Sequence, residues 1–217
     1  MTFRRFKRAL GAATLFLALC GSATHAAPAK ILMFGTSLTQ GLGLPPGTEL
    51  PVVLQTKLAS AGTPAKVINA GVSGDTSADG VSRIAWSLAD HPDAAIVELG
   101  SNDALRGLDP KDTEKNIAAI LEKLKAAHVP VLLLGMKAPR NLGPQYVSAF
   151  DAIYPRLAHD HHITLYPFVL DSVALDPTLN QADGIHPNPA GVQVIAKRML
   201  PYVERLLGEV HARKGSP

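Results

Sequence analysis

The strongest constraint on the fold is an alternation of short apolar runs with longer amphipathic stretches. Such stretches carry apolar residues at helical spacing, whereas the short runs have the length of buried strands. Strand–helix units joined by short links predict parallel strands with right-handed crossovers. We therefore expect an α/β fold in three layers, in which a doubly wound, five-stranded parallel sheet lies between helices. The expected strands cover residues 31–34, 67–69, 94–99, 129–135 and 163–166.

Capping residues and prolines mark where the helices begin and end. Thr48 is a candidate N-cap, and Asp109 followed by Pro110 is typical of a helix start. Pro201 is expected to kink or divide the last helix, because proline lacks the N–H that an internal turn needs. Trp86, Tyr146 and Phe150 are assigned to core or loop packing. The expected helices cover about residues 49–60, 77–90, 110–127, 144–159 and 189–207.

The first 26 residues differ from the rest of the chain and predict a cleaved export signal. A basic start precedes an apolar run over residues 9–19 and then small residues, and Thr24-His25-Ala26 suits cleavage. The apolar run is shorter than the roughly 18 residues that a retained membrane anchor needs. We therefore expect residues 27–217 to form one domain that is periplasmic or secreted, without stable membrane insertion.

Composition excludes several function classes. The chain has 21 basic and 18 acidic residues, but four of the basic residues and none of the acidic ones lie in the predicted signal. The rest of the chain has no excess of basic residues of the kind that binds nucleic acid. The single cysteine, Cys20, also lies in the signal, so the mature chain has no disulfide and no thiolate nucleophile. Residues 159–162, His-Asp-His-His, are interpreted as a solvated helix end rather than a metal site, since their side chains point in different directions.

Polar residues follow the predicted strands, where a parallel sheet of this kind places its ligand. Ser37 follows the first strand in a sharp turn after Gly35, as a nucleophile requires. Asp183 precedes His186 by three residues and can accept its Nδ1–H, which leaves Nε2 free to take a proton from serine. Each motif alone has an ordinary alternative, a strand-ending turn or a capping Asp beside a surface His. Their meeting at one sheet edge favours a serine hydrolase.

Two further loops offer hydrogen-bond donors at the same edge. Gly74 lies in a bend with two glycines, over residues 69–77, whose backbone N–H groups can point at an anion. Asn102 follows the third strand and can donate its side-chain amide to an oxyanion. A plain turn and a capping role are the respective alternatives, and each motif alone leaves the choice open.

The chain resembles the SGNH (GDSL-type) hydrolase family, and within it the bacterial periplasmic thioesterase, protease and lysophospholipase group. The resemblance rests on four blocks in this order: GTSLTQG, SGDTS, ELGSNDALRG and DGIHPN. The similarity runs from Lys30 to about Tyr202. It implies the flavodoxin-like SGNH hydrolase fold, without metal or organic cofactor. By resemblance, the triad is Ser37, Asp183 and His186, and the oxyanion hole is formed by the backbone N–H groups of Ser37 and Gly74 and by the Asn102 amide.

One position departs from the family's pattern. The family usually has Asp directly before the serine, whereas this chain has Thr36. A hydroxyl has a shorter reach and no charge, so the sequence leaves open how the nucleophile turn is held. Glu98 lies within an apolar strand, either as a buried acid near the site or facing a water channel, and the sequence leaves both open. Four residues in loops beside the predicted cleft are possible parts of an acyl pocket: Leu105, Arg106, Met136 and Pro139.

The resemblance and the residues together predict a serine esterase or thioesterase that acts through an acyl-enzyme. Its expected partner is a small-molecule acyl ester, such as an aryl ester or a lysophospholipid, and no expectation about oligomeric state follows. A carbohydrate O-acetyl esterase and a catalytically silent binding protein of the same fold are the alternatives. A deep apolar channel would favour long acyl chains, and a shallow polar cleft would favour sugars.

Overall fold

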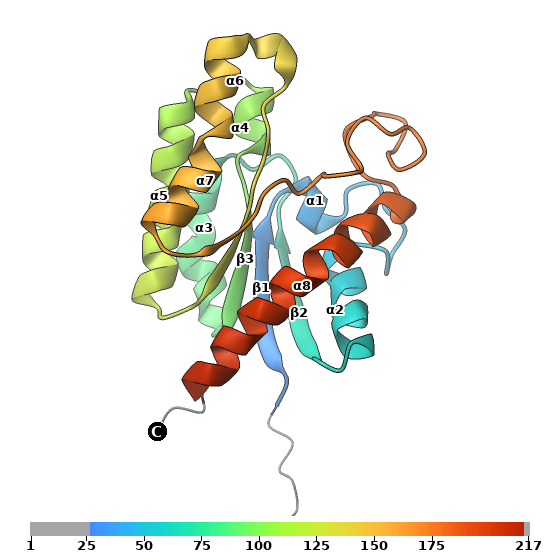
Figure 1. The fold of residues 1–217 in the computed structure, drawn as a ribbon, viewed down its shortest axis with the longest axis vertical. Helices are drawn as coiled ribbons and strands as arrows, with labels where there is room; N and C mark the ends of the chain where they lie inside the picture. The colour runs from blue at the N-terminus through green and yellow to red at the C-terminus, as the bar shows by residue number, and fades with distance from the viewer. Residues whose placement is uncertain (1–26, 215–217) are drawn as a thin grey trace, which may run out of the picture.

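The computed structural model describes residues 27–214, and its strands form one parallel sheet in the order β2-β1-β3-β4-β5 (Figure 1). The expected α/β sheet is confirmed. Winding proceeds from β1 outward to β2 and, in the opposite direction, from β3 to β5, so the switch point lies between β1 and β3. Ligands bind at such a point, beyond the carboxyl ends of the strands. The strands are β1 (Ala29–Gly35), β2 (Ala65–Gly71), β3 (Ala94–Glu98), β4 (Val131–Leu134) and β5 (Thr164–Tyr166).

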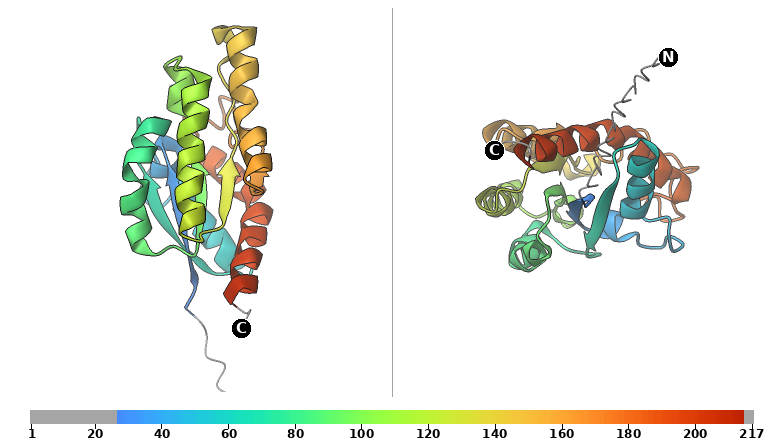
Figure 2. Two further views of the ribbon diagram at one scale, coloured as in Figure 1. Left: turned by 90° about the vertical axis from the view of Figure 1, so that its left-hand side faces the viewer. Right: turned by 90° about the horizontal axis from the view of Figure 1, so that it is seen from below.

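Helices cover both faces of the sheet (Figures 1 and 2). On one face α2 packs against α8; on the other, α3 packs against α5 and α5 against α7. The longer helices are α2 (Leu50–Ser60), α3 (Ser77–Ser87), α5 (Pro110–Ala126), α6 (Pro144–Asp151), α7 (Ile153–Asp160) and α8 (Pro189–Lys214). Shorter ones are α1 (Ser37–Gln40), η1 (Leu88–Asp90), α4 (Ser101–Leu105) and η2 (Arg140–Leu142). Among residues 27–214 no helix has the length and apolar character that crossing a membrane requires.

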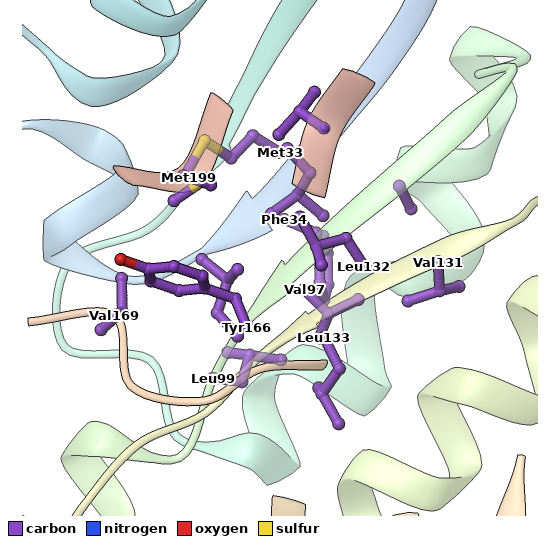
Figure 3. Packing of buried hydrophobic residues seen from close by; sticks show 14 of the residues in the cluster. Met33, Phe34, Val97, Leu99, Val131, Leu132, Leu133, Tyr166, Val169 and Met199 are labelled. Atoms are coloured by element: carbon purple, nitrogen blue, oxygen red, sulfur yellow. The ribbon is translucent and has the colours of Figure 1, made fainter. Parts of the chain in front are cut away.

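Burial explains why the strands read as continuous apolar runs. Met33 and Phe34 in β1 and Val97 in β3 have no exposed surface, because helices cover both faces of these central strands. Figure 3 shows Phe34 and Val97 packed with Leu133 of β4, and with Met199 of α8 nearby. The hydrophobic effect on this scale is the main source of stability, and it leaves few positions where a polar side chain can lie.

Several helix starts follow the predicted capping chemistry. The carboxylate of Asp109 accepts a hydrogen bond from the N–H of Lys111, and Pro110 occupies the first helical position of α5, as expected. Helix α3 begins with a reciprocal capping box, which was not predicted from the sequence. The Thr76 hydroxyl accepts from the N–H of Asp79, and the Asp79 carboxylate accepts from the N–H of Thr76 at 2.9 Å.

Two expectations about the helices are wrong, and part of a third, the division of the last helix at Pro201, is wrong as well. Thr48 does not cap α2, because Glu49 takes the N-cap position and the Thr48 hydroxyl donates to the Pro45 carbonyl instead. Residues 144–160 form two helices, α6 and α7, rather than one. Pro201 does not divide α8, which continues to Lys214; this proline lies on the exposed side of the helix, where water can reach the carbonyl that lacks its usual N–H partner.

Trp86 is also misassigned by the sequence, because 81% of its surface is exposed. Helix α3 buries Gly80, Ile84 and Ser87, and Trp86 lies outside this face. Phe150 is fully buried, as expected, and Tyr146 packs against the core and stacks on Phe150.

Two glycines, one tightly packed and one with open space around it, provide a test of the packing beside β1. A Cβ on Gly71 would lie 2.2 Å from the Gln40 nitrogen and 2.7 Å from the Thr36 carbonyl oxygen, both backbone atoms of the turn after β1. A Cβ on Gly208 of α8 would meet nothing within 4 Å. We expect Gly71→Ala to lower the free energy of unfolding by about 1–3 kcal/mol through overpacking. Gly208→Ala should raise it by about 0.5–1 kcal/mol through helix propensity.

Urea unfolding of both variants beside the wild type measures these changes. A Gly71→Ala protein as stable as the wild type would show that the turn after β1 moves freely, contrary to the packing described.

Candidate active site

Ser37 lies at the switch point, where β1 ends and the single turn of α1 begins. Gly35 ends the strand and Ser37 is the first residue of the turn. The N–H of Gln40 donates to the Thr36 carbonyl at 2.9 Å, and the N–H of Gly41 donates to the Ser37 carbonyl at 2.9 Å. Gly41 closes the turn with φ of 88°, a left-handed conformation that favours glycine. The serine hydroxyl is therefore presented from a short but closed turn at the edge of the sheet.

His186 approaches Ser37 from the loop that follows β5. Its Nε2 lies 2.9 Å from the Ser37 Oγ, and its Nδ1 lies 2.6 Å from Oδ2 of Asp183. An ionised Asp183 can only accept, so Nδ1 carries the proton and Nε2 is the acceptor for the serine hydroxyl. Residues that are 149 positions apart in the chain thus form one hydrogen-bonded series.

Asp183 is held in its ionised form by several donors. Its Oδ1 accepts hydrogen bonds from the backbone N–H groups of His186, at 3.0 Å, and Ile185, at 2.9 Å. The backbone N–H of His186, then its side chain, and then the N–H of Ile185 lower the pKa of Asp183 to about 2. The carboxylate therefore stays charged throughout the neutral and mildly acidic range.

The two loops with the expected oxyanion donors are joined to each other. Asn102, in α4, donates its Nδ2–H to the Asp75 carbonyl at 2.8 Å. The next residue, Asp103, is buried and accepts from the N–H of Ser77 at 2.8 Å and from its hydroxyl at 2.5 Å. Gly74 has φ of 86°, which favours glycine at this bend.

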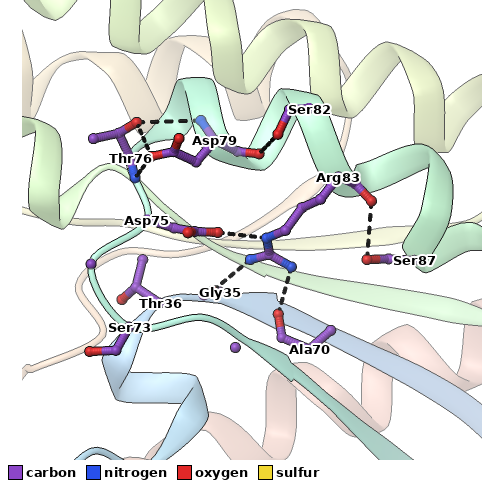
Figure 4. A network of polar contacts seen from close by, with 12 residues as sticks. Gly35, Thr36, Ala70, Ser73, Asp75, Thr76, Asp79, Ser82, Arg83 and Ser87 are labelled. Carbon is purple, nitrogen blue, oxygen red and sulfur yellow. Dashed lines mark hydrogen bonds and ion pairs between the residues drawn. The ribbon is translucent and has the colours of Figure 1, made fainter.

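Arg83 ties the ends of two strands to one of these loops (Figure 4). Its guanidinium donates to the carbonyl oxygens of Gly35 at 2.8 Å and Ala70 at 2.9 Å, and Nε donates to Asp75 Oδ2 at 2.6 Å. The same group lies over the Phe34 ring, 3.9 Å from its centroid. Arg83 was not predicted from the sequence. Its position next to Ile84, an apolar residue of the expected helix, could have indicated that it lies close to the sheet.

Glu98 is completely buried, at the carboxyl end of β3 and in register with Gly35 of β1. It accepts hydrogen bonds from the Thr36 N–H at 2.8 Å, the Thr36 hydroxyl at 2.9 Å and the Thr39 hydroxyl at 2.9 Å. Burial raises the pKa of Glu98 to about 7, and the hydrogen bonds from Thr36 and Thr39 oppose the rise. Of the two alternatives that the sequence leaves open, the buried acid near the site is therefore correct.

A cavity of about 530 Å³ opens beside Ser37 and is lined mainly by apolar side chains. Among its walls are Ser37, Asn102 and His186, together with three of the expected pocket residues, Leu105, Met136 and Pro139. Arg106 is not in the lining; it follows α4 and donates to the Gly74 carbonyl at 2.7 Å. Seven apolar lining residues were not singled out from the sequence: Leu38, Ala138, Phe168, Leu170, Ala174, Leu175 and Ile185.

The histidines near the end of α7 do not converge. His159 Nδ1 lies 2.9 Å from Asp160 Oδ1, whereas His161 Nδ1 lies 3.2 Å from Glu122 Oε1. Within residues 27–214 there is no group of three or more His, Cys, Asp or Glu side chains placed to hold a metal ion.

The raised pKa of Glu98 has a consequence for stability. In the unfolded chain the carboxyl ionises near its ordinary pKa of 4.5, whereas the folded protein holds the proton to about 7. The contribution of Glu98 to the free energy of unfolding should therefore fall as pH rises between these values and level off above them. Gln at position 98 cannot ionise. The free energy of unfolding of Glu98→Gln should therefore increase relative to that of the wild type as pH rises.

Urea unfolding of both proteins from about pH 5 to about pH 8 measures the difference. A difference that is constant over this range would mean that Glu98 keeps its ordinary pKa in the folded protein.

Comparison with known proteins places the described site in a family context. Residues 33–194 match the model of the GDSL-like Lipase/Acylhydrolase family. Esterase TesA of Pseudomonas aeruginosa is 38% identical over 192 residues, which are 88% of this chain and 96% of that protein. Thioesterase 1/protease 1/lysophospholipase L1 of Escherichia coli K12 is 39% identical over 194 residues, or 89% and 91% of the two chains. Among solved structures, AlinE4, an SGNH-hydrolase family esterase, aligns with a TM-score of 0.71 and 45% identity, covering 84% of this chain and 98% of that one.

Proposed function

Because this chain belongs to the GDSL-like Lipase/Acylhydrolase family, we propose that it hydrolyses small-molecule carboxylic esters and thioesters through an acyl-enzyme formed on Ser37. Relatives that are 38% and 39% identical over most of the chain are named esterase, thioesterase and lysophospholipase. The observation that carries the proposal is the 2.9 Å separation between Ser37 Oγ and His186 Nε2. A serine activated in this way attacks acyl carbonyl groups.

The proposed reaction begins with proton transfer within the hydrogen-bonded series. Ser37 Oγ attacks the acyl carbon while its proton passes to Nε2 of His186. The charged Asp183, 2.6 Å from Nδ1, stabilises the imidazolium that results. His186 then gives the proton to the leaving alcohol or thiol as the bond to the acyl carbon breaks. Water repeats the two steps and releases the acid.

Three donors are assigned to the oxyanion that forms in each step: the backbone N–H groups of Ser37 and Gly74 and the side-chain amide of Asn102. The amide carries two N–H bonds, and one of them donates to the Asp75 carbonyl at 2.8 Å. That contact fixes the orientation of the amide and leaves its second N–H for the oxyanion. Donors held in advance cost no reorganisation when charge develops.

The substrate class follows from the cavity. Its volume of about 530 Å³ and its apolar walls support an acyl chain rather than the acetyl group of a sugar. Leu105, Met136 and Pro139 are proposed to contact that chain. The hydrogen-bonded series of Ser37, His186 and Asp183 argues against a silent binding protein, since a ligand-binding site alone does not require it.

Export remains part of the proposal. Residues 1–26 lie outside the described part of the chain, and their basic, apolar and small-residue order predicts a cleaved signal. Amino-terminal sequencing of the exported protein should begin at about Ala27. An intact Met1 would contradict periplasmic or secreted localisation.

Hydrolysis of p-nitrophenyl esters of increasing acyl length tests the function directly. We expect kcat/KM to rise as the chain lengthens from acetyl until the cavity is full, because each buried methylene contributes roughly 0.8 kcal/mol. Acetylated sugars should be poor substrates. Ser37→Ala should lose both hydrolysis and labelling by a fluorophosphonate probe. Labelling of the wild type together with hydrolysis of acetylated sugars alone would favour the O-acetyl esterase instead.

Asn102→Ala tests the oxyanion assignment. Loss of one such donor typically lowers kcat about 10²- to 10³-fold, or roughly 3–4 kcal/mol of transition-state stabilisation. KM should change little, because the ground-state carbonyl uses the donor less. Steady-state kinetics on the folded variant measures both constants. Asn102→Ala with wild-type kcat/KM would remove Asn102 from the oxyanion hole.

A further inference from the structure

We propose that Glu98 is a positioning residue for the reaction, and that its buried carboxyl group fixes the turn bearing Ser37 through Thr36 and Thr39. This inference rests on the proposed function, because it assigns to Ser37 the role of nucleophile. It answers the question raised by Thr36, which stands where the family usually has an acidic residue.

Glu98 lacks the partner that a buried carboxyl group ordinarily has. No lysine, arginine or histidine within residues 27–214 forms an ion pair with it, although its side chain is fully buried at the end of β3. The hydrogen bonds that its carboxyl group accepts come from two residues, Thr36 and Thr39. A buried acid retained without a cation costs stability, which points to a role other than holding the core together.

The donors to Glu98 lie on both sides of Ser37. Thr36 precedes the serine and donates twice, from its N–H at 2.8 Å and its hydroxyl at 2.9 Å. Thr39 follows it by two residues and donates from its hydroxyl at 2.9 Å. A helix of four residues is too short to be stable by itself, so α1 depends on such external contacts.

The Thr36 hydroxyl confirms where the anchoring contact lies. Thr36 is the N-cap of α1, where a hydroxyl usually accepts from the second or third N–H of the helix, yet its side chain makes no such capping bond. It donates to Glu98 instead. Gly35 provides a second, independent sign, because a Cβ there would lie 2.1 Å from Thr39 Oγ1 and 2.5 Å from Glu98 Oε2. The glycine before the turn leaves the space in which carboxyl and hydroxyl meet.

The consequence for the reaction is geometric. The rotation of α1 about its axis determines where Ser37 Oγ lies relative to His186 Nε2, which comes from a different loop. If Glu98 no longer accepts from Thr36, the turn keeps its own backbone hydrogen bonds and the contacts of Thr39 and Gln40, but its first residues lose their anchor to β3. Misplacement of a reacting group by about 1 Å can cost 10²-fold in rate, so the loss should appear in kcat rather than in binding.

The test compares variants that break this contact with variants that keep it. Thr36→Val removes the hydroxyl while preserving shape. Glu98→Gln replaces one acceptor oxygen of the carboxyl group by an NH2 group, which can only donate, so the donors from Thr36 and Thr39 can no longer all be accepted. Thr36→Ser keeps the hydroxyl and serves as the conservative rescue. Tyr166→Phe is the matched control, since it removes a buried hydroxyl on β5, at the edge of the sheet and outside the cavity lining.

We expect Glu98→Gln and Thr36→Val to lower kcat by about 10- to 100-fold with little change in KM on a short-chain p-nitrophenyl ester. Thr36→Ser and Tyr166→Phe should stay close to the wild type. Circular dichroism and urea unfolding establish that each variant is folded. Folded Glu98→Gln and Thr36→Val proteins with wild-type kcat would overturn the proposal and leave the esterase assignment intact.

Crystal structures of the same variants provide a readout that does not depend on turnover. In Glu98→Gln and Thr36→Val we expect Ser37 Oγ to move away from the 2.9 Å separation from His186 Nε2. An unchanged separation in both would overturn the proposal. Failure of the proposed function would be seen in the wild type itself, as absence of hydrolysis and labelling, whatever these distances are.

Discussion

The parallel pairing of β1 with β3 is the contact on which the rest of the structure depends. It sets Gly35 opposite Glu98 at the carboxyl end of both strands, where the winding of the sheet changes direction. Because helices cover both faces, these strands are apolar almost throughout, and Glu98 is their only buried charged residue. The buried carboxyl group needs donors. The turn after β1 supplies them, and Ser37 lies within that turn.

Two charged side chains, Arg83 as donor and Asp103 as acceptor, hold the loops at this edge through hydrogen bonds. Asp103 joins α4 to the start of α3 through Ser77, and Arg83 joins the ends of β1 and β2 to Asp75. Neither side chain belongs to the proposed reacting set. Burying such groups is costly, and loss of the Asp103 carboxylate would deprive the Ser77 N–H of the partner described here. A site built in this way is rigid before substrate arrives, which is what oxyanion stabilisation requires.

Ser37 separates two environments. On one side lie the polar contacts of the turn with Glu98, and on the other lies a cavity with mainly apolar walls. Proton transfer in the proposed reaction uses His186 and Asp183, whereas the acyl chain is proposed to contact cavity side chains such as Leu105 and Met136. Changes in the cavity walls can therefore alter acyl preference without disturbing the hydrogen-bonded series.

The sequence by itself determined the features that depend on local pattern. The alternation of apolar runs and amphipathic stretches predicted the parallel sheet, because the strand and helix periods are properties of neighbouring residues. The order of the four blocks likewise predicted that Ser37, Asp183 and His186 would meet, and their atoms do lie within hydrogen-bonding distance. Asp109 and Pro110 correctly predicted the start of α5, because helix capping also depends on neighbouring residues.

Only the tertiary structure decided how distant segments meet. The partners of Glu98 lie 59 and 62 residues away along the chain, so no local pattern could identify them. Arg106 faces Gly74 rather than the cavity, and Trp86 faces solvent, because the packing of α4 and α3 sets the direction of each side chain. Much of the cavity comes from residues 167–188, a segment without helical or strand periodicity. Side-chain direction in such a segment follows from long-range contacts, which the sequence does not display.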